Sequence, residues 1–149
     1  MKKNAEVLSD LIKINNDRVK GYEKAAKETD AKDADLRILF NNMAAESRQY
    51  ANELENQLAD RASSPDDKTT VSGDIYRAWM DVKNVFSGKD RKTILASCEY
   101  GEDAAQKAYE SALKKADITD DVRQVLSEQK FRLRKSHDTI KRMRDMQPA

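Results

Sequence analysis

Apolar residues recur every three or four positions along four long stretches of the chain, which is the spacing of one buried helix face. The first face is bounded by Val7 and Ala26, and the second by Leu36 and Leu58. Two further faces occupy residues 95–112, in a helix that we expect to begin near Asp90, and residues 122–143. The pattern predicts four amphipathic helices and an all-α fold.

Short runs of turn residues divide these four helices into two pairs. Residues 29–33 (TDAKD) separate the first two helices, and residues 119–121 (TDD) precede the fourth. Thr and Asp are favoured at turns and at helix N-caps. Because a short turn between two long helices places them antiparallel, we expect two helix hairpins.

The segment between the hairpins begins with a polar run, RASSPDDKTTVS, at residues 61–72. Pro65 does not allow the preceding helix to continue. Apolar residues at helical spacing then return before Gly88, a residue type common just past a helix end. They are Ile75, Trp79, Val82 and Phe86. We expect a long crossover that carries an extra short helix, with Trp79 as its anchor in the core.

The two hairpins resemble each other in sequence. YEKAAK at residues 22–27 aligns with YESALK at residues 109–114, and the same register pairs Asn15 with Glu102. Lys-rich and Ala-rich helices also resemble one another by composition, so chance is the alternative. Two hairpins joined by a long crossover are what a bundle needs when its second and third helices run parallel.

Composition limits the function classes that the chain supports. Its 149 residues match one domain, residues 1–149, and 28 Lys and Arg nearly cancel 27 Asp and Glu. No global field therefore attracts nucleic acid or an anionic membrane. The N-terminus lacks the apolar core of a signal peptide, and no stretch is apolar enough to span a bilayer.

The single cysteine, Cys98, has no partner for an internal disulfide or a CxxC metal site. We interpret it as a buried structural thiol and expect a cytoplasmic protein.

Six short segments along the chain together carry a family resemblance. They are INNDR at residues 14–18, GYEKA at 21–25, MAAES at 43–47, RAWMDVK at 77–83, CEYGED at 98–103 and SHD at 136–138. With these segments the chain resembles small bacterial ferritin-like four-helix-bundle proteins defined by a domain of unknown function. The resemblance covers nearly the whole chain and implies a ferritin-like fold. In that family a His often precedes the Arg-Ala-Trp segment, whereas this chain has Tyr76.

Ferritin-like oxidases hold two iron or manganese ions with a Glu from each of two helices and Glu-x-x-His from each of the others. Here Glu46 is followed three residues later by Gln49 and not by His, and Asn15 occupies the position in the repeat that is equivalent to Glu102. A di-metal centre would therefore need unconventional ligands. The candidates are Glu23, Glu46, Glu99, Glu102 and His137. We predict no cofactor, with iron or manganese as the alternative.

The competing interpretation of these polar residues is a hydrogen-bonded layer inside the bundle. Its predicted members are Asn15, Tyr22, Tyr50, Glu102, Tyr109 and Gln129. Buried polar groups require partners, and such a layer fixes the register of the helices. The only histidine, His137, is expected to be solvated or to cap a helix.

The fourth helix carries a basic stripe. Its members are Lys130, Arg132, Arg134, Lys135, Lys141, Arg142 and Arg144. We expect a solvated face whose charges are paired with acids of the second helix, such as Glu46, Glu53 and Glu55. Binding of anions or nucleic acid through this stripe is the alternative, although no aromatic stacking platform accompanies it.

No phosphate-binding loop, catalytic triad or Cys-His pair supports a conventional enzyme class. The leading hypothesis is a structural or interaction protein that acts through a partner or through self-association into a homo-oligomer. The resemblance adds a link to stress physiology. Two alternatives remain open: an atypical di-metal oxidase or metal-storage protein, and an anion-binding protein.

Overall fold

The computed structural model describes residues 2–60, 90–115 and 117–147. Within these ranges the chain is helical and contains no strand, which confirms the all-α prediction. The elements are α1 (Lys2–Glu28), the short 3-10 helix η1 (Ala31–Asp33), α2 (Ala34–Asp60), α4 (Arg91–Leu113) and α5 (Asp120–Asp145). The helix expected around Trp79 lies outside the described residues.

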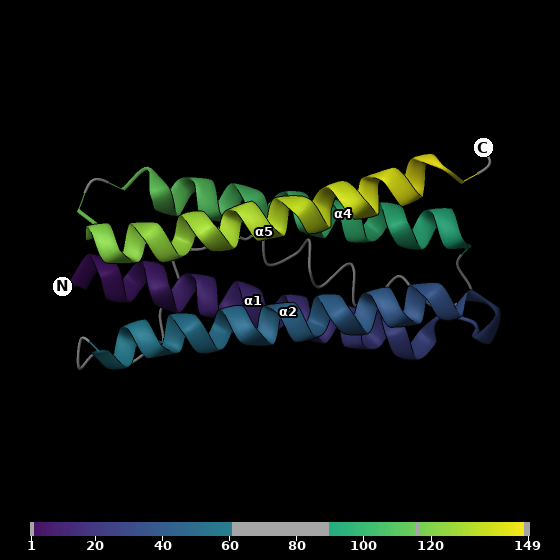
Figure 1. The fold of residues 1–149 in the computed structure, drawn as a ribbon, viewed down its shortest axis with the longest axis horizontal. Coiled ribbons are helices and arrows are strands. Elements are labelled where there is room, and N and C mark those ends of the chain that lie inside the picture. The colour runs from purple at the N-terminus through teal and green to yellow at the C-terminus, as the bar shows by residue number, and fades with distance from the viewer. Residues whose placement is uncertain (1, 61–89, 116, 148–149) are drawn as a thin grey trace.

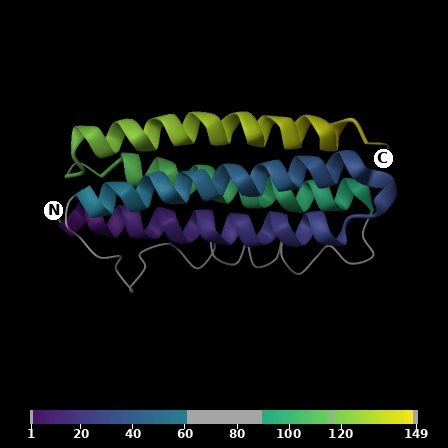
Figure 2. The same ribbon diagram turned by 60° about the horizontal axis from the view of Figure 1, so that its bottom comes forward.

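The helices form two antiparallel hairpins, α1 with α2 and α4 with α5, which lie side by side with their axes roughly aligned (Figures 1 and 2). Contacts at the helix ends give their directions. Asn4 at the start of α1 donates to Thr119 beside the start of α5, and Arg91 of α4 binds Asp35 of α2. The helices α2 and α4 therefore run parallel, in an arrangement compatible with a four-helix bundle.

The turn residues act where the sequence predicts helix boundaries. The backbone N–H of Thr29 donates to the carbonyl of Ala25 at the end of α1. Asp90 is the N-cap of α4, and its carboxylate accepts a 2.8 Å hydrogen bond from the backbone N–H of Thr93. Such a bond satisfies one of the amide groups that a helix start leaves without an intrahelical partner.

The predicted apolar faces meet in the core, and the helix faces deduced from periodicity are confirmed. Fully buried side chains come from all four helices. They include Leu8, Leu11, Leu36, Phe40, Leu54, Leu95, Leu126 and Leu133. Cys98 is buried, as expected. None of the described helices combines the length and the apolarity that a bilayer span requires.

Candidate functional site

The centre of the bundle contains a buried arginine. Arg18 lies on the apolar face of α1, four residues after Ile14 and four before Tyr22, and is 0% exposed. Its Nε and Nη2 donate to Oε1 of Glu102 at 2.9 and 2.7 Å. Its Nη1 donates to Oε1 of Glu46 at 3.0 Å. One guanidinium therefore joins α1, α2 and α4.

Glu102 is the main anionic partner of this guanidinium. Its Oε1 also accepts a 2.5 Å hydrogen bond from the hydroxyl of Tyr22, whereas its Oε2 has no hydrogen-bond partner among the described residues. Burial, and then the negative charge of Glu102, raise the pKa of Tyr22 well above its ordinary value of 10.0. Burial is the largest single influence on the pKa of Arg18 and lowers it, but Glu102, Tyr22 and Glu46 together outweigh burial and raise that pKa.

A chain of hydrogen bonds extends from Arg18 through the rest of the interior. Nη1 of Arg18 donates to Oγ of Ser47 at 2.8 Å, and Ser47 donates to Oδ1 of Asn15 at 2.9 Å. Nδ2 of Asn15 donates to the hydroxyl of Tyr109 at 2.9 Å, and Tyr109 donates to Gln129 at 2.6 Å. All four described α-helices contribute to this layer.

The residues predicted to form a polar layer are thus close together, with one difference in role. Gln129 donates to the backbone carbonyl of Tyr50 and to the carboxylate of Glu53. Tyr50 therefore contributes its main chain to the layer. Burial raises the pKa of the Tyr50 and Tyr109 hydroxyls.

The interior carboxylates do not fit a di-metal centre. Glu46 and Glu102 both bind the guanidinium of Arg18, so a fixed cation already lies between them. Glu23 lies apart from them on the surface, where it pairs with Arg48. A metal ion among Glu46 and Glu102 would have to coexist with a buried positive charge, which electrostatic repulsion opposes.

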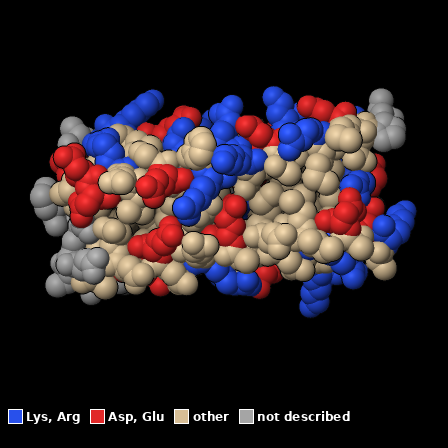
Figure 3. Space-filling view, viewed as in Figure 1, with Lys and Arg blue, Asp and Glu red and all other residues tan. Residues whose placement is uncertain are grey.

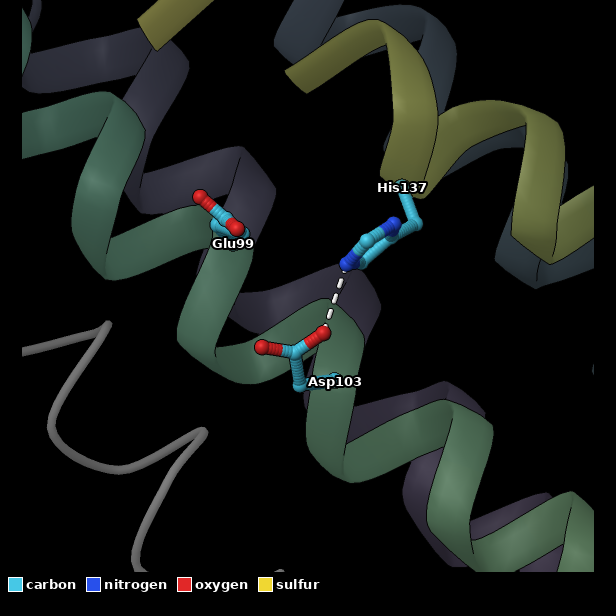
Figure 4. A group of neighbouring side chains, drawn as sticks. All are labelled: Glu99, Asp103 and His137. Carbon is cyan, nitrogen blue, oxygen red and sulfur yellow. Dashed lines mark hydrogen bonds and ion pairs between the residues drawn. The ribbon is translucent and has the colours of Figure 1, made fainter. Parts of the chain in front are cut away.

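The other two metal candidates lie together between α4 and α5, and with them is a residue that the sequence interpretation missed. Glu99 and Asp103 are on successive turns of α4, and His137 projects toward them from α5 (Figure 4). Nε2 of His137 is 2.6 Å from Oδ1 of Asp103, and Nδ1 is 3.1 Å from Oδ1 of Asp138. One possible ligand atom from each of Glu99, Asp103 and His137 lies within 4.8 Å of the other two.

The surroundings of this cluster are partly closed. Glu99 and His137 are buried and Asp103 is exposed, so the expectation that His137 is solvated or caps a helix is wrong. Arg144, in the last turn of α5, forms an ion pair with Glu99. The pKa of Asp138 is lowered, mainly by the hydrogen bond between its carboxylate and His137.

A third feature is a hollow between α2 and α5, which we call the α2–α5 groove. Its volume is about 310 Å³. It is lined by Leu39, Asn42, Met43, Glu46, Tyr50, Arg132, Lys135, Ser136 and Thr139. A stretch of uncharged surface runs between the two helices, with basic atoms on the α5 side (Figure 3).

The basic residues of the groove lack acidic partners in the described part of the chain. Arg132 and Lys135 form no ion pair there, and the ammonium of Lys135 lies 4.7 Å from the centre of the Phe131 ring. The expectation that acids of α2 pair with the basic stripe of α5 does not hold for these two residues. Glu46 binds Arg18 and Ser136 instead.

Two residues central to these sites, Arg18 and Asp103, were not among the candidates. The sequence contained a sign of the role of Arg18, because this residue lies on the apolar face of its helix, seven positions after Leu11. A charged residue that is buried on such a face requires a partner. Asp103 follows Glu99 by four residues and so shares its helix face. Nothing local connects it to His137, which lies 34 residues away.

Comparison with known proteins identifies a family for this chain but assigns no activity to it. The model of a family described as Domain of unknown function (DUF2383) matches residues 3–115. No curated protein matches the chain.

Proposed function

Because this chain belongs to the DUF2383 family, which is defined by a domain of unknown function, we propose a function from the protein's own surface. The protein is an interaction module whose binding site is the α2–α5 groove. Its ligand is an acidic segment of a partner protein that also carries an apolar side chain. The observation that carries this proposal is the pair Arg132 and Lys135, which border the groove without an acidic partner in the described residues.

The interior supports binding in preference to catalysis. Arg18, Tyr22 and Glu102 are fully buried and bound to one another, so a substrate has no access to their polar atoms. A buried ion pair of this kind adds little net stability compared with apolar packing, but it can select one arrangement of the helices. The layer therefore acts as the internal frame of the module, and the recognition surface lies outside it.

The charge of the groove favours an anionic ligand. Arg132 and Lys135 are exposed, whereas the one carboxylate of the groove, Glu46, accepts from Arg18 at 3.0 Å and from Ser136 at 2.9 Å. The carboxylate of Glu46 is thus held by Arg18 and Ser136, and Arg18 shares its single positive charge between Glu46 and Glu102. The two rim cations are left to bind a carboxylate of a partner, and Arg is especially suited to a bidentate contact with one.

The floor of the groove favours an apolar side chain beside that carboxylate. Leu39 and Met43 lie on the α2 side, and Met43 is only 5% exposed. A volume of about 310 Å³ is at the lower end of the range for small-molecule sites and accommodates one or two side chains of a segment. An amphipathic segment that lies along two helices is a common recognition mode.

The directions of the helices support a ferritin-like topology for this module. The parallel arrangement of α2 and α4, with antiparallel hairpins on either side, is that of bundles with one long crossover. In such a bundle the two hairpins meet along α2 and α5 on one side. The proposed groove lies on that line of contact.

The test is a nuclear magnetic resonance titration of the labelled protein with a synthetic helical peptide that has Glu on one face and Leu on the other. We expect the signals of Asn42 and Thr139 to shift, because both line the groove. In the double variant Arg132→Gln/Lys135→Gln the affinity should fall at least tenfold, which corresponds to about 1.4 kcal/mol.

The control is Lys141→Gln/Arg142→Gln, which removes the same charge from exposed positions of α5 outside the groove. An equal loss in both double variants would contradict the proposal and favour general attraction of anions, including nucleic acid, to the basic stripe. A dimer in sedimentation equilibrium that Arg132→Gln/Lys135→Gln abolishes would identify a second copy of this chain as the occupant.

A further inference from the structure

Glu99, Asp103 and His137 form a cluster that neither the interior layer nor the α2–α5 groove uses. Glu99 and Asp103 are separated by one turn of α4, so their carboxylates lie on the same face of that helix. His137 approaches this face from α5 (Figure 4). We propose that these three side chains form a binding site for one divalent transition-metal ion, with Zn²⁺ as the reference ion.

The spacing of the three side chains suits a single ion. Zn²⁺ binds nitrogen and carboxylate oxygen ligands at about 2.0–2.2 Å, which places two ligands of a tetrahedral site about 3.4 Å from each other. The three ligand atoms here lie within 4.8 Å of one another. Nε2 of His137 and Oδ1 of Asp103, at 2.6 Å, need to separate by less than about 1 Å to reach that ligand spacing.

The hydrogen bond on the far side of the imidazole points to the same use. Nδ1 of His137 is 3.1 Å from the carboxylate of Asp138. Metal-binding histidines commonly donate their second ring N–H to a carboxylate, which fixes the ring orientation and the tautomer. With an ion bound, Nδ1–H would donate to Asp138, and the lone pair of Nε2 would bind the ion in place of the present contact with Asp103.

The ligand types indicate which class of ion would bind. An imidazole with two carboxylates suits Zn²⁺, Mn²⁺ and Fe²⁺, whereas Mg²⁺ and Ca²⁺ prefer oxygen ligands alone. Asp103 is exposed, so an ion can enter from solvent, while Glu99 and His137 are buried and already positioned. Three protein ligands leave a further coordination position for water.

Arg144 is the group with which a metal ion would compete. Its guanidinium forms an ion pair with Glu99 and also binds Asp145. Metal binding at Glu99 would displace this guanidinium, and Arg144 would keep its pairing with Asp145. The site is therefore linked to the last turn of α5, where both residues lie.

The experiment uses the untagged, chelator-treated chain of 149 residues, in which His137 is the single histidine. Zn²⁺ is titrated by calorimetry, and the imidazole signals of His137 are followed by nuclear magnetic resonance. We expect one Zn²⁺ per chain, a shift of the His137 signals, and no such shift with Mg²⁺ at the same concentration. Asp103→Asn should weaken Zn²⁺ binding at least tenfold, a change typical of disturbed metal sites.

The matched control is Glu128→Gln, which neutralises an exposed carboxylate on α5 outside the cluster and should leave Zn²⁺ binding unchanged. Asp103→Asn is preferred to a His137 variant because the exposed Asp103 side chain can change without loss of the fold. The absence of Zn²⁺ binding, binding that leaves the His137 signals in place, or equal affinity in Asp103→Asn would each overturn the proposal. His137 would then be a structural link between α4 and α5.

Discussion

The hydroxyl of Tyr22 donates to Glu102 of the other hairpin at 2.5 Å. The relationship has a counterpart, because Tyr109 accepts a hydrogen bond from Asn15 at 2.9 Å. In the internal repeat Tyr22 corresponds to Tyr109 and Asn15 to Glu102. Tyr22 and Tyr109, which occupy equivalent positions in the two hairpins, thus each form a hydrogen bond with the other hairpin. Their partners, Glu102 and Asn15, are also equivalent in the repeat. Arg18 breaks this symmetry, since its counterpart in the repeat is Ala105.

Replacement of Arg18 by Met should destabilise the protein strongly. The change leaves Glu102 fully buried without its cation, and breaking a buried ion pair from one side costs about 3–5 kcal/mol. The double variant Arg18→Met/Glu102→Gln should recover a large part of that loss, because both charges are gone. Urea denaturation of the two single variants and the double variant measures the coupling.

The comparison for this prediction is Arg48→Met, which removes an ion pair with Glu23 in which both side chains are about half exposed. Exposed pairs contribute at most about 1 kcal/mol. Equal losses for Arg18→Met and Arg48→Met would show that the interior ion pair does not hold the hairpins together.

Stability should fall at alkaline pH in a way that depends on Tyr22. Its pKa is raised by burial and by Glu102, so above pH 10.0, its ordinary value, the unfolded chain loses this proton while the folded chain keeps it. The free energy of unfolding then falls by about 1.4 kcal/mol for each pH unit from this group. Tyr22→Phe should be less stable than the wild type at neutral pH, and the difference should narrow above pH 10.0. A constant difference in denaturation experiments from pH 8 to about 11 would contradict this.

The groove residues should contribute to binding without contributing to stability. Arg132 and Lys135 are exposed and form no ion pair with the described residues, so replacing both by Gln removes no structural contact apart from that of Lys135 with Phe131. The free energy of unfolding should change by less than about 0.5 kcal/mol per site. A larger loss in urea denaturation would assign these residues a structural role.

Arg144→Gln should strengthen binding of Zn²⁺ to the cluster of Glu99, Asp103 and His137. The substitution removes the cation that pairs with Glu99 and so frees this carboxylate for the metal. Calorimetric titration of the variant and the wild type gives the change in affinity. Weaker binding in Arg144→Gln would mean that Arg144 positions Glu99 for the ion instead of competing with it.

The sequence by itself determined the four helices and which side of each is buried. Helix periodicity is a local property, so the face that contains Leu11, Asn15 and Tyr22 could be predicted without knowledge of its neighbours. The turn at residues 29–33 and the cap at Asp90 are equally local, since they depend on backbone groups a few residues away. The placement of Glu102 and Gln129 on buried faces followed from the same pattern.

Only the tertiary structure decided which of these residues meet. The rotation of each helix and its shift along the bundle axis determine whether Arg18 reaches Glu102, 84 residues away, or another carboxylate. The same two quantities bring Asp103 to His137 and leave Glu23 on the surface. Periodicity gives the face of a helix and says nothing of its axial position, because many shifts bury the same apolar residues. The partners of the buried charges could therefore be identified only in the tertiary structure.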